Sequence, residues 1–162
     1  KSIANSGGAV SKLVGVLAGS PATLRAFARL RSELHGGDLP PATAIRIGLA
    51  VAERRGDGYS VAQHARSARL SGLGLDEISL ARSFGSTDPK EAAMLAFVKG
   101  TMESEGHPPH HLLEEAREAD WTDEQLLEAL GEIALNEFQS LVANAAGLPQ
   151  DQIDASVLPS AA

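Results

Sequence analysis

The chain has 162 residues, of which 43% are hydrophobic, 22% are charged and 4% are aromatic, and its formal net charge is -7. This length and composition are typical of a soluble globular domain with a sizeable core. The negative charge argues against a nucleic-acid partner, because binding a phosphate backbone requires clustered cations. No apolar run approaches the ~20 residues of a membrane span. We therefore expect a cytoplasmic protein without a membrane partner.

Two groups of arginines stand out against this acidic background. They are Arg25, Arg29 and Arg31, and Arg46, Arg54 and Arg55. We interpret both groups as solvated helix faces or subunit contacts.

Helix starts are marked by capping residues and prolines along the sequence. The side chain of Ser, Thr or Asp accepts a hydrogen bond from the first helical turn, and proline suits the first helical position. The predicted starts are Ser20-Pro21, Leu39-Pro40-Pro41, Asp57, Asp76, Asp88-Pro89, Pro108-Pro109 and Thr122, the last with Gln125 as its capping-box partner.

Apolar residues recur at helical spacing after these starts. The longest stripe follows Thr122 and runs from Leu126 to Val142. No alternating strand pattern of useful length occurs. We therefore predict a single all-α domain of about seven or eight helices spanning residues 1–162, with flexible ends at about 1–8 and 155–162.

The segment 56–64, Gly-Asp-Gly-Tyr-Ser-Val-Ala-Gln-His, is the most informative part of the chain. It has the arrangement of a redox motif, Cys-x-Tyr-Cys-x-x-x-His, at a helix start. Asp57 and Ser60 occupy the cysteine positions, whereas Tyr59 and His64 match the motif. The chain contains no cysteine, so no other thiol replaces them.

Further segments, in the same order, resemble the carboxymuconolactone decarboxylase and alkylhydroperoxidase D-like superfamily. They lie at residues 30–40, 48–56, 65–73, 88–93 and 121–138, and the likeness extends over roughly residues 18–154. The resemblance implies an alkylhydroperoxidase D-like helical fold. It also implies a homotrimer or a hexamer built as a trimer of dimers, with pockets near the subunit interfaces.

In the peroxidase members of this superfamily, a helix N-terminus favours the thiolate form of the two cysteines, and a histidine and an upstream glutamate relay protons. Carried over by position, the cysteines fall at Asp57 and Ser60, the histidine at His64 and the glutamate at Ile45. Aspartate and serine form no disulfide. We therefore expect no dithiol-dependent peroxidase activity.

The lactone-decarboxylating members use acid–base chemistry without a redox cysteine pair. By this resemblance we expect chemistry on, or binding of, a small organic acid or lactone, without a cofactor or a metal ion. Histidine titrates nearest to neutral pH, so His64 is the first candidate acid or base. Tyr59, Ser60 and Asp57 complete the candidate catalytic set.

Each candidate also has a structural interpretation. His64 is equally well explained as a hydrogen-bonded interface residue, and Tyr59 as a packed ring with a satisfied hydroxyl. Asp57 is best explained as a helix cap, and Ser60 lacks the geometry of a hydrolase triad, because its partners come from the same turns. On these interpretations the protein is a non-catalytic oligomer. A further alternative is peroxidase activity, which only the family resemblance supports.

His107, His110 and His111 form a His-Pro-Pro-His-His segment that resembles a metal-binding loop. The two prolines restrict convergence of the imidazoles, and no acidic ligand is fixed nearby. We interpret the segment as a solvated helix start.

Overall fold

The computed structural model describes residues 11–150 as eight α-helices joined by turns, without a β-strand in that range. The helices are α1 (Lys12–Leu17), α2 (Pro21–His35), α3 (Pro41–Arg54), α4 (Gly58–Leu70), α5 (Leu75–Arg82), α6 (Pro89–Glu103), α7 (His110–Glu118) and α8 (Asp123–Ala145). The predicted all-α class is confirmed. The ends expected to be flexible, about 1–8 and 155–162, lie outside the described residues.

The predicted caps set most helix boundaries. Ser20 Oγ accepts a hydrogen bond from the Thr23 backbone at 3.3 Å, and Thr122 forms a capping box with Gln125. The short helix predicted from Asp76 begins one residue earlier, at Leu75. Helix α1 was not predicted, because a helix of 6 residues is too short to show apolar periodicity.

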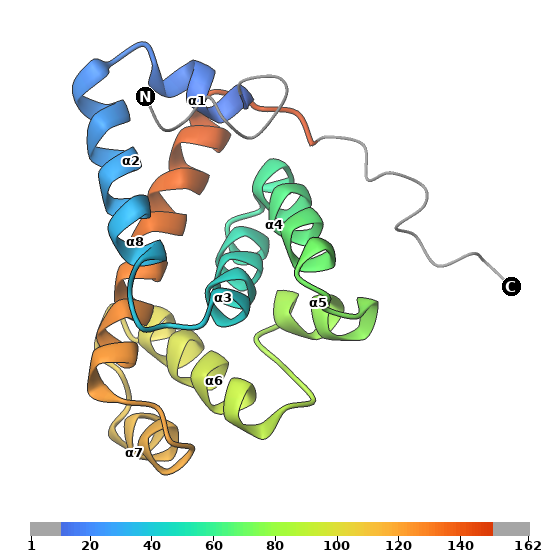
Figure 1. Ribbon diagram of the computed structural model, residues 1–162, viewed down its shortest axis with the longest axis vertical. Coiled ribbons are helices and arrows are strands. Elements are labelled where there is room, and N and C mark those ends of the chain that lie inside the picture. Colours follow the sequence, from blue (N-terminus) through green and yellow to red (C-terminus); the bar gives the residue numbers. More distant parts are fainter. Residues whose placement is uncertain (1–10, 151–162) are drawn as a thin grey trace, which may run out of the picture.

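Helix α3 lies in the middle of the molecule, with α2 and α8 side by side at one edge (Figure 1). Its residues 47–52 are all buried. Ile47 and Val51 pack with Met94 and Val98 of α6 in the main core, which α7 and α8 complete. Phe27 and Phe138, with ring centroids 6.0 Å apart, join α2 to α8.

The prediction that the arginine groups lie on solvated faces or in subunit contacts is wrong for Arg46. This residue of α3 is only 9% exposed. Its guanidinium donates a hydrogen bond to Glu77 at 3.1 Å and lies 3.7 Å from Glu91. Burial raises the pKa of Glu77, but hydrogen bonds from Ser86, Thr87 and Arg46 lower it to about 2. A buried cation is retained here because carboxylates surround it.

Within residues 11–150, none of the helices combines the length and the apolar character that crossing a membrane demands.

Candidate functional site

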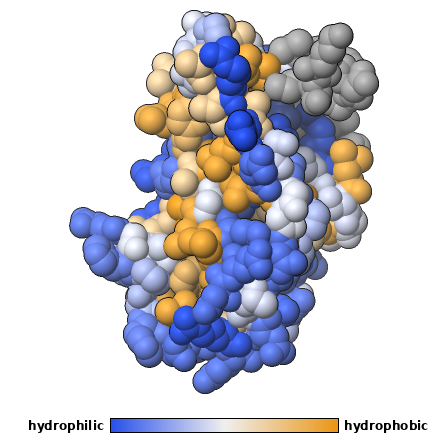
Figure 2. All heavy atoms as spheres, turned by 60° about the vertical axis from the view of Figure 1, so that its left-hand side comes forward, coloured by the Kyte–Doolittle hydropathy of each residue, from blue (hydrophilic) through white to orange (hydrophobic). Residues whose placement is uncertain are grey.

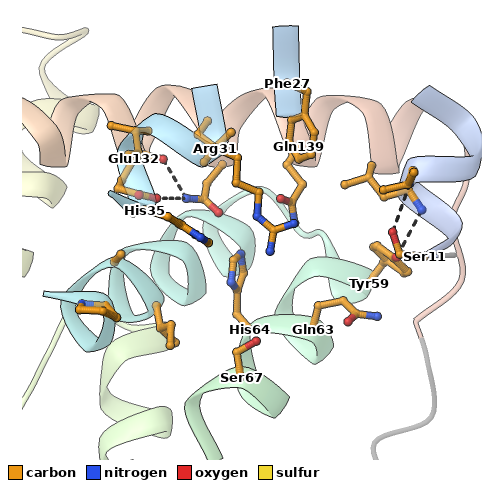
Figure 3. Close-up of a pocket in the computed structure, with 18 of the residues that line it drawn as sticks. Ser11, Phe27, Arg31, His35, Tyr59, Gln63, His64, Ser67, Glu132 and Gln139 are labelled. Atoms are coloured by element: carbon orange, nitrogen blue, oxygen red, sulfur yellow. Dashed lines mark hydrogen bonds between the residues drawn. The ribbon is translucent and has the colours of Figure 1, made fainter. Parts of the chain in front are cut away.

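A cavity of about 480 Å³ lies among α1, α2, α3, α4 and α8 (Figure 3). We call it the His64 cavity. Its walls are partly apolar, with Phe27, Leu34, Leu39, Ile45 and Leu135 among the lining side chains. Its polar lining includes Arg31, His35, Tyr59, His64, Glu132 and Asn136.

His64 lies on α4, with its imidazole against α3 at Gly48. A Cβ at position 48 would come within 2.6 Å of the ring, so the glycine makes room for the histidine. The Nε2 atom is buried and has no hydrogen-bond partner among the described residues. Burial lowers the pKa of His64 to about 4, and Arg31 adds to this effect, whereas Asn136 and Asp57 oppose it. The imidazole is therefore neutral at neutral pH.

Asp57 lies outside the lining of the His64 cavity. Its Oδ1 accepts a hydrogen bond from the Ser60 backbone at 3.0 Å, and its Oδ2 accepts one from the Ser140 hydroxyl at 2.9 Å. The side chain is only 2% exposed. Both carboxylate oxygens are thus engaged in capping α4 and joining it to α8.

Ser60 also lies outside the cavity lining. It is 1% exposed, and its hydroxyl oxygen accepts a hydrogen bond from Gln139 Nε2 at 3.0 Å. Ser60 and Asp57 together connect the start of α4 to α8 at the two positions where the redox motif has cysteines. We refer to these two residues with Gln139 and Ser140 as the α4 joint.

Tyr59 lines the cavity, and its ring packs in the apolar cluster formed by α1, α2, α4 and α8. Its hydroxyl oxygen accepts a hydrogen bond from the Leu13 backbone at 3.3 Å. Tyr59 therefore fastens α1 beside the cavity. Of the four candidate residues, the structure brings His64 and Tyr59 to the cavity and places Asp57 and Ser60 in the α4 joint.

Glu132 of α8 is a cavity residue that the sequence analysis did not single out. It is 4% exposed, and its Oε2 accepts a hydrogen bond from Asn136 Nδ2 at 3.3 Å. Burial raises the pKa of Glu132 to about 7, with Asn136 and Arg31 opposing the rise and Glu128 adding to it. The sequence does contain a signal for this residue. Glu132 is three residues from both Ala129 and Leu135, so it shares the inward apolar face of α8, where a carboxylate is rare.

Arg31 and His35, one turn apart on α2, point toward the imidazole of His64 (Figure 3). Across residues 11–150, Arg31 forms no ion pair with a carboxylate within 4.0 Å. Burial and the Arg31 charge lower the pKa of His35. The cavity therefore presents an unneutralised guanidinium beside a neutral imidazole.

The His107, His110 and His111 segment lies away from this cavity, at the start of α7. The His110 side chain is 87% exposed and lies 4.0 Å from Glu114. In the part of the chain that the structure describes, no group of three or more His, Asp or Glu side chains is arranged to hold a metal ion.

A comparison of the sequence with protein-family models gives no match, and no curated protein matches it at a significant level. Solved structures do match the fold. A protein of unknown function from Agrobacterium tumefaciens, suggested to be the antioxidant defence protein AhpD, has a TM-score of 0.74 at 20% identity; 83% of this chain and 94% of that chain are covered.

Two further structures agree. An uncharacterised peroxidase-related protein from Ralstonia eutropha JMP134 with an alkylhydroperoxidase AhpD core has a TM-score of 0.76 at 21% identity, covering 84% of this chain and 74% of its own. A single-residue variant of the debrominase Bmp8, in a complex with 2,3,4-tribromopyrrole, has a TM-score of 0.78 at 17% identity; 92% of this chain and 81% of that chain are covered. The chain therefore has the alkylhydroperoxidase D-like fold, and the resemblance of its motifs is confirmed at the level of the fold.

Proposed function

We propose that the His64 cavity binds a small organic acid or lactone and that His64 acts on it as a general base. The observation that carries this proposal is the buried, unpartnered Nε2 of a neutral imidazole. A buried polar atom without a hydrogen bond costs free energy, so it is retained most readily where a ligand supplies the missing partner. A general base also has to be unprotonated before it accepts a proton.

The size and charge of the cavity support a small anionic ligand. A volume of about 480 Å³ is within the range of small-molecule sites. The guanidinium of Arg31 can pair with a carboxylate through two hydrogen bonds, or donate a hydrogen bond to a lactone carbonyl. The structure of Bmp8 with 2,3,4-tribromopyrrole shows that a protein of this fold accommodates a small flat ring.

The α4 joint argues against thiol chemistry at the motif. The chain has no cysteine, and the side chains of Asp57 and Ser60 are both engaged in hydrogen bonds. Purified protein free of metal and haem is expected to show no dithiol-dependent turnover of an organic hydroperoxide. Sustained turnover in such a preparation would contradict the proposal.

The test of His64 compares His64→Ala with His111→Ala, which removes an exposed histidine outside the cavity lining. Calorimetric titration with a panel of small carboxylates and lactones should give binding to the wild type and to His111→Ala. For ligands that carry a hydroxyl group able to donate to Nε2, His64→Ala should lose at least about tenfold in affinity, the scale of one buried hydrogen bond. Equal affinity in both variants would rule out the role of His64.

A second proposal, which holds with or without catalysis, is self-association as a homotrimer or a hexamer. Leu127 and Leu141 of α8 are 69% and 67% exposed, and Leu30 of α2 is 42% exposed. Apolar side chains gather in a band on the face that carries these two helices (Figure 2). Covering such a band with a second copy removes apolar area from water.

A further inference from the structure

We propose that Glu132 is a second proton-transfer group of the His64 cavity, acting as a general acid while His64 acts as the base. This inference rests on the proposed function, because it assigns a partner to the same base. It has three requirements. Glu132 has to face the cavity, and it has to carry a proton while His64 carries none. The proton that His64 takes from the ligand and the proton that Glu132 gives to it also have to balance.

The position of Glu132 meets the first requirement. It enters the cavity from α8, whereas His64 enters from α4, so a ligand in the cavity can contact both. Asn136 donates a hydrogen bond from Nδ2 to Glu132 Oε2 at 3.3 Å. No described residue donates a hydrogen bond to the other oxygen, Oε1. One carboxyl oxygen is therefore held in place and the other is available to a ligand.

The second requirement concerns the charges that face Glu132 from each wall. Helix α2 contributes Arg31 and His35, α4 contributes Tyr59 and His64, and α8 itself contributes Glu128. The lining residues from α1 and α3 carry no titratable group. Burial outweighs the attraction of Arg31 and raises the pKa of Glu132 to about 7, whereas burial lowers that of His64 to about 4. At neutral pH a protonated carboxyl group thus coexists with a neutral imidazole, the arrangement of an acid and a base.

The proton movements balance for a β,γ-unsaturated acid or lactone, which has a C–H bond between its carbonyl group and its carbon–carbon double bond. That C–H bond breaks, its proton binds Nε2 of His64, and its electron pair forms a carbon–carbon double bond. The carbonyl π electrons move to oxygen, which takes the proton of Glu132. The result is an enol, an imidazolium and a carboxylate.

The reverse transfers complete an isomerisation. The imidazolium returns its proton to a different carbon of the conjugated system, and the Glu132 carboxylate takes back the enol proton. Both side chains then regain their starting states without an oxidant, a reductant or a cofactor. In the intermediate, the imidazolium and the carboxylate stabilise each other across the cavity.

The experiment uses sodium benzoate as the probe anion and compares wild type, Glu132→Gln and Glu124→Gln, the last a control on an exposed residue of α8. In the wild type, benzoate affinity should fall about tenfold between pH 6 and pH 8, as Glu132 loses its proton and repels the anion. Glu132→Gln should abolish this fall, and Glu124→Gln should retain it. A pH-independent affinity in the wild type would overturn the role of Glu132.

A second readout needs no ligand. The ring nitrogens of His64, identified by their loss in His64→Ala, should show an inflection near pH 7 in long-range ¹H–¹⁵N spectra of the wild type. The inflection should disappear in Glu132→Gln and persist in Glu124→Gln. If it persists in Glu132→Gln, another group causes it and the inference is wrong. If benzoate and the panel of acids bind none of the proteins, the proposed function fails, and the His64 spectra alone decide whether the two groups are coupled.

Discussion

The α4 joint and the His64 cavity lie next to each other and differ in how far their buried polar groups are hydrogen-bonded. In the joint, Asp57 accepts a hydrogen bond from Ser140 of α8 and Ser60 accepts one from Gln139 of α8. In the cavity, Nε2 of His64 has no partner among the described residues. Satisfied buried groups stabilise a fold, whereas an unsatisfied one costs stability and is retained for another reason. Asp57 and Ser60, at the motif positions of the cysteines, are thus structural, and the groups that we propose for chemistry lie one turn further along α4 and on α8.

The largest expected effect tests the joint. Asp57→Ala removes the cap of α4 and leaves the Ser140 hydroxyl without its buried acceptor. We expect a loss of roughly 2–4 kcal/mol in the free energy of unfolding, combining a lost cap with an unsatisfied hydrogen bond. Urea denaturation measures it. Asp57→Asn, which keeps an acceptor for the cap, should lose less, and a loss below about 0.5 kcal/mol for Asp57→Ala would show that the joint is not structural.

The second prediction concerns how the cavity responds to pH. In the folded chain the pKa of Glu132 is raised from 4.5 to about 7. Between these two pH values the folded chain therefore binds more protons than the unfolded chain, so the free energy of unfolding falls as pH rises. The folded chain lowers the pKa of His64 from 6.5 to about 4, so the free energy of unfolding falls as pH drops through that window. Each contribution is at most about 3 kcal/mol.

Because these two slopes oppose each other between pH 4.5 and pH 6.5, Glu132→Gln should expose the slope of His64. Relative to wild type, the variant should gain up to about 3 kcal/mol at pH 8 and little near pH 4. Urea denaturation at a series of pH values measures the difference. Glu124→Gln should follow the wild type at every pH, and a parallel curve for Glu132→Gln would contradict the raised pKa.

Much of this fold was predictable because its helix ends are set by local chemistry. Ser20, Asp57, Asp88 and Thr122 all cap the helices that follow them, as predicted. Apolar spacing likewise predicted the long helix that follows Thr122, which is α8. These signals depend on neighbours within one or two turns, so they are legible in the sequence.

The cavity was predictable only in part, because it depends on which helices meet. Tyr59 and His64 were found through the motif, but Arg31 and Glu132 reach the same space from α2 and α8. A periodic pattern shows which face of a helix is buried, but it does not show which other helices enclose a cavity beside that face. For the same reason Arg46 was expected on a solvated helix face or in a subunit contact, although Glu77 and Glu91 of its own chain surround it.

The third prediction tests the contact between α3 and the cavity. In Gly48→Ala the new Cβ would lie 2.6–2.8 Å from three ring atoms of His64, so the imidazole has to move. We expect a loss of about 1–3 kcal/mol from overpacking and a displaced ring. Gly15→Ala, in open space on α1, should instead gain up to about 1 kcal/mol. Unfolding curves and the ¹⁵N signals of His64 measure both effects; an unmoved His64 signal in Gly48→Ala would contradict the contact.

Substitutions in the apolar band are expected to have the smallest effect on the stability of a single chain. Their effect on the assembly of the chain should be the clearest. Leu127 and Leu141 lie 14 residues apart, close to four helical turns, and therefore share one face of α8. Exchanging both for glutamine removes little buried area within one chain, so the free energy of unfolding of a single chain should change by less than about 0.5 kcal/mol. If a second copy covers this face, the same exchange opposes association, because glutamine amides would be buried without partners.

Light scattering at micromolar concentration should therefore give the wild type a mass that is a multiple of 16.8 kDa and the double variant a mass near 16.8 kDa. Leu70→Gln is the matched control, since Leu70 is 85% exposed but lies at the end of α4, away from the band. It should leave the mass unchanged, because a lone exposed leucine needs no partner surface. A wild type that scatters as a monomer would show that the band stays in water, and an oligomer that survives the double exchange would place the interface elsewhere on the molecule.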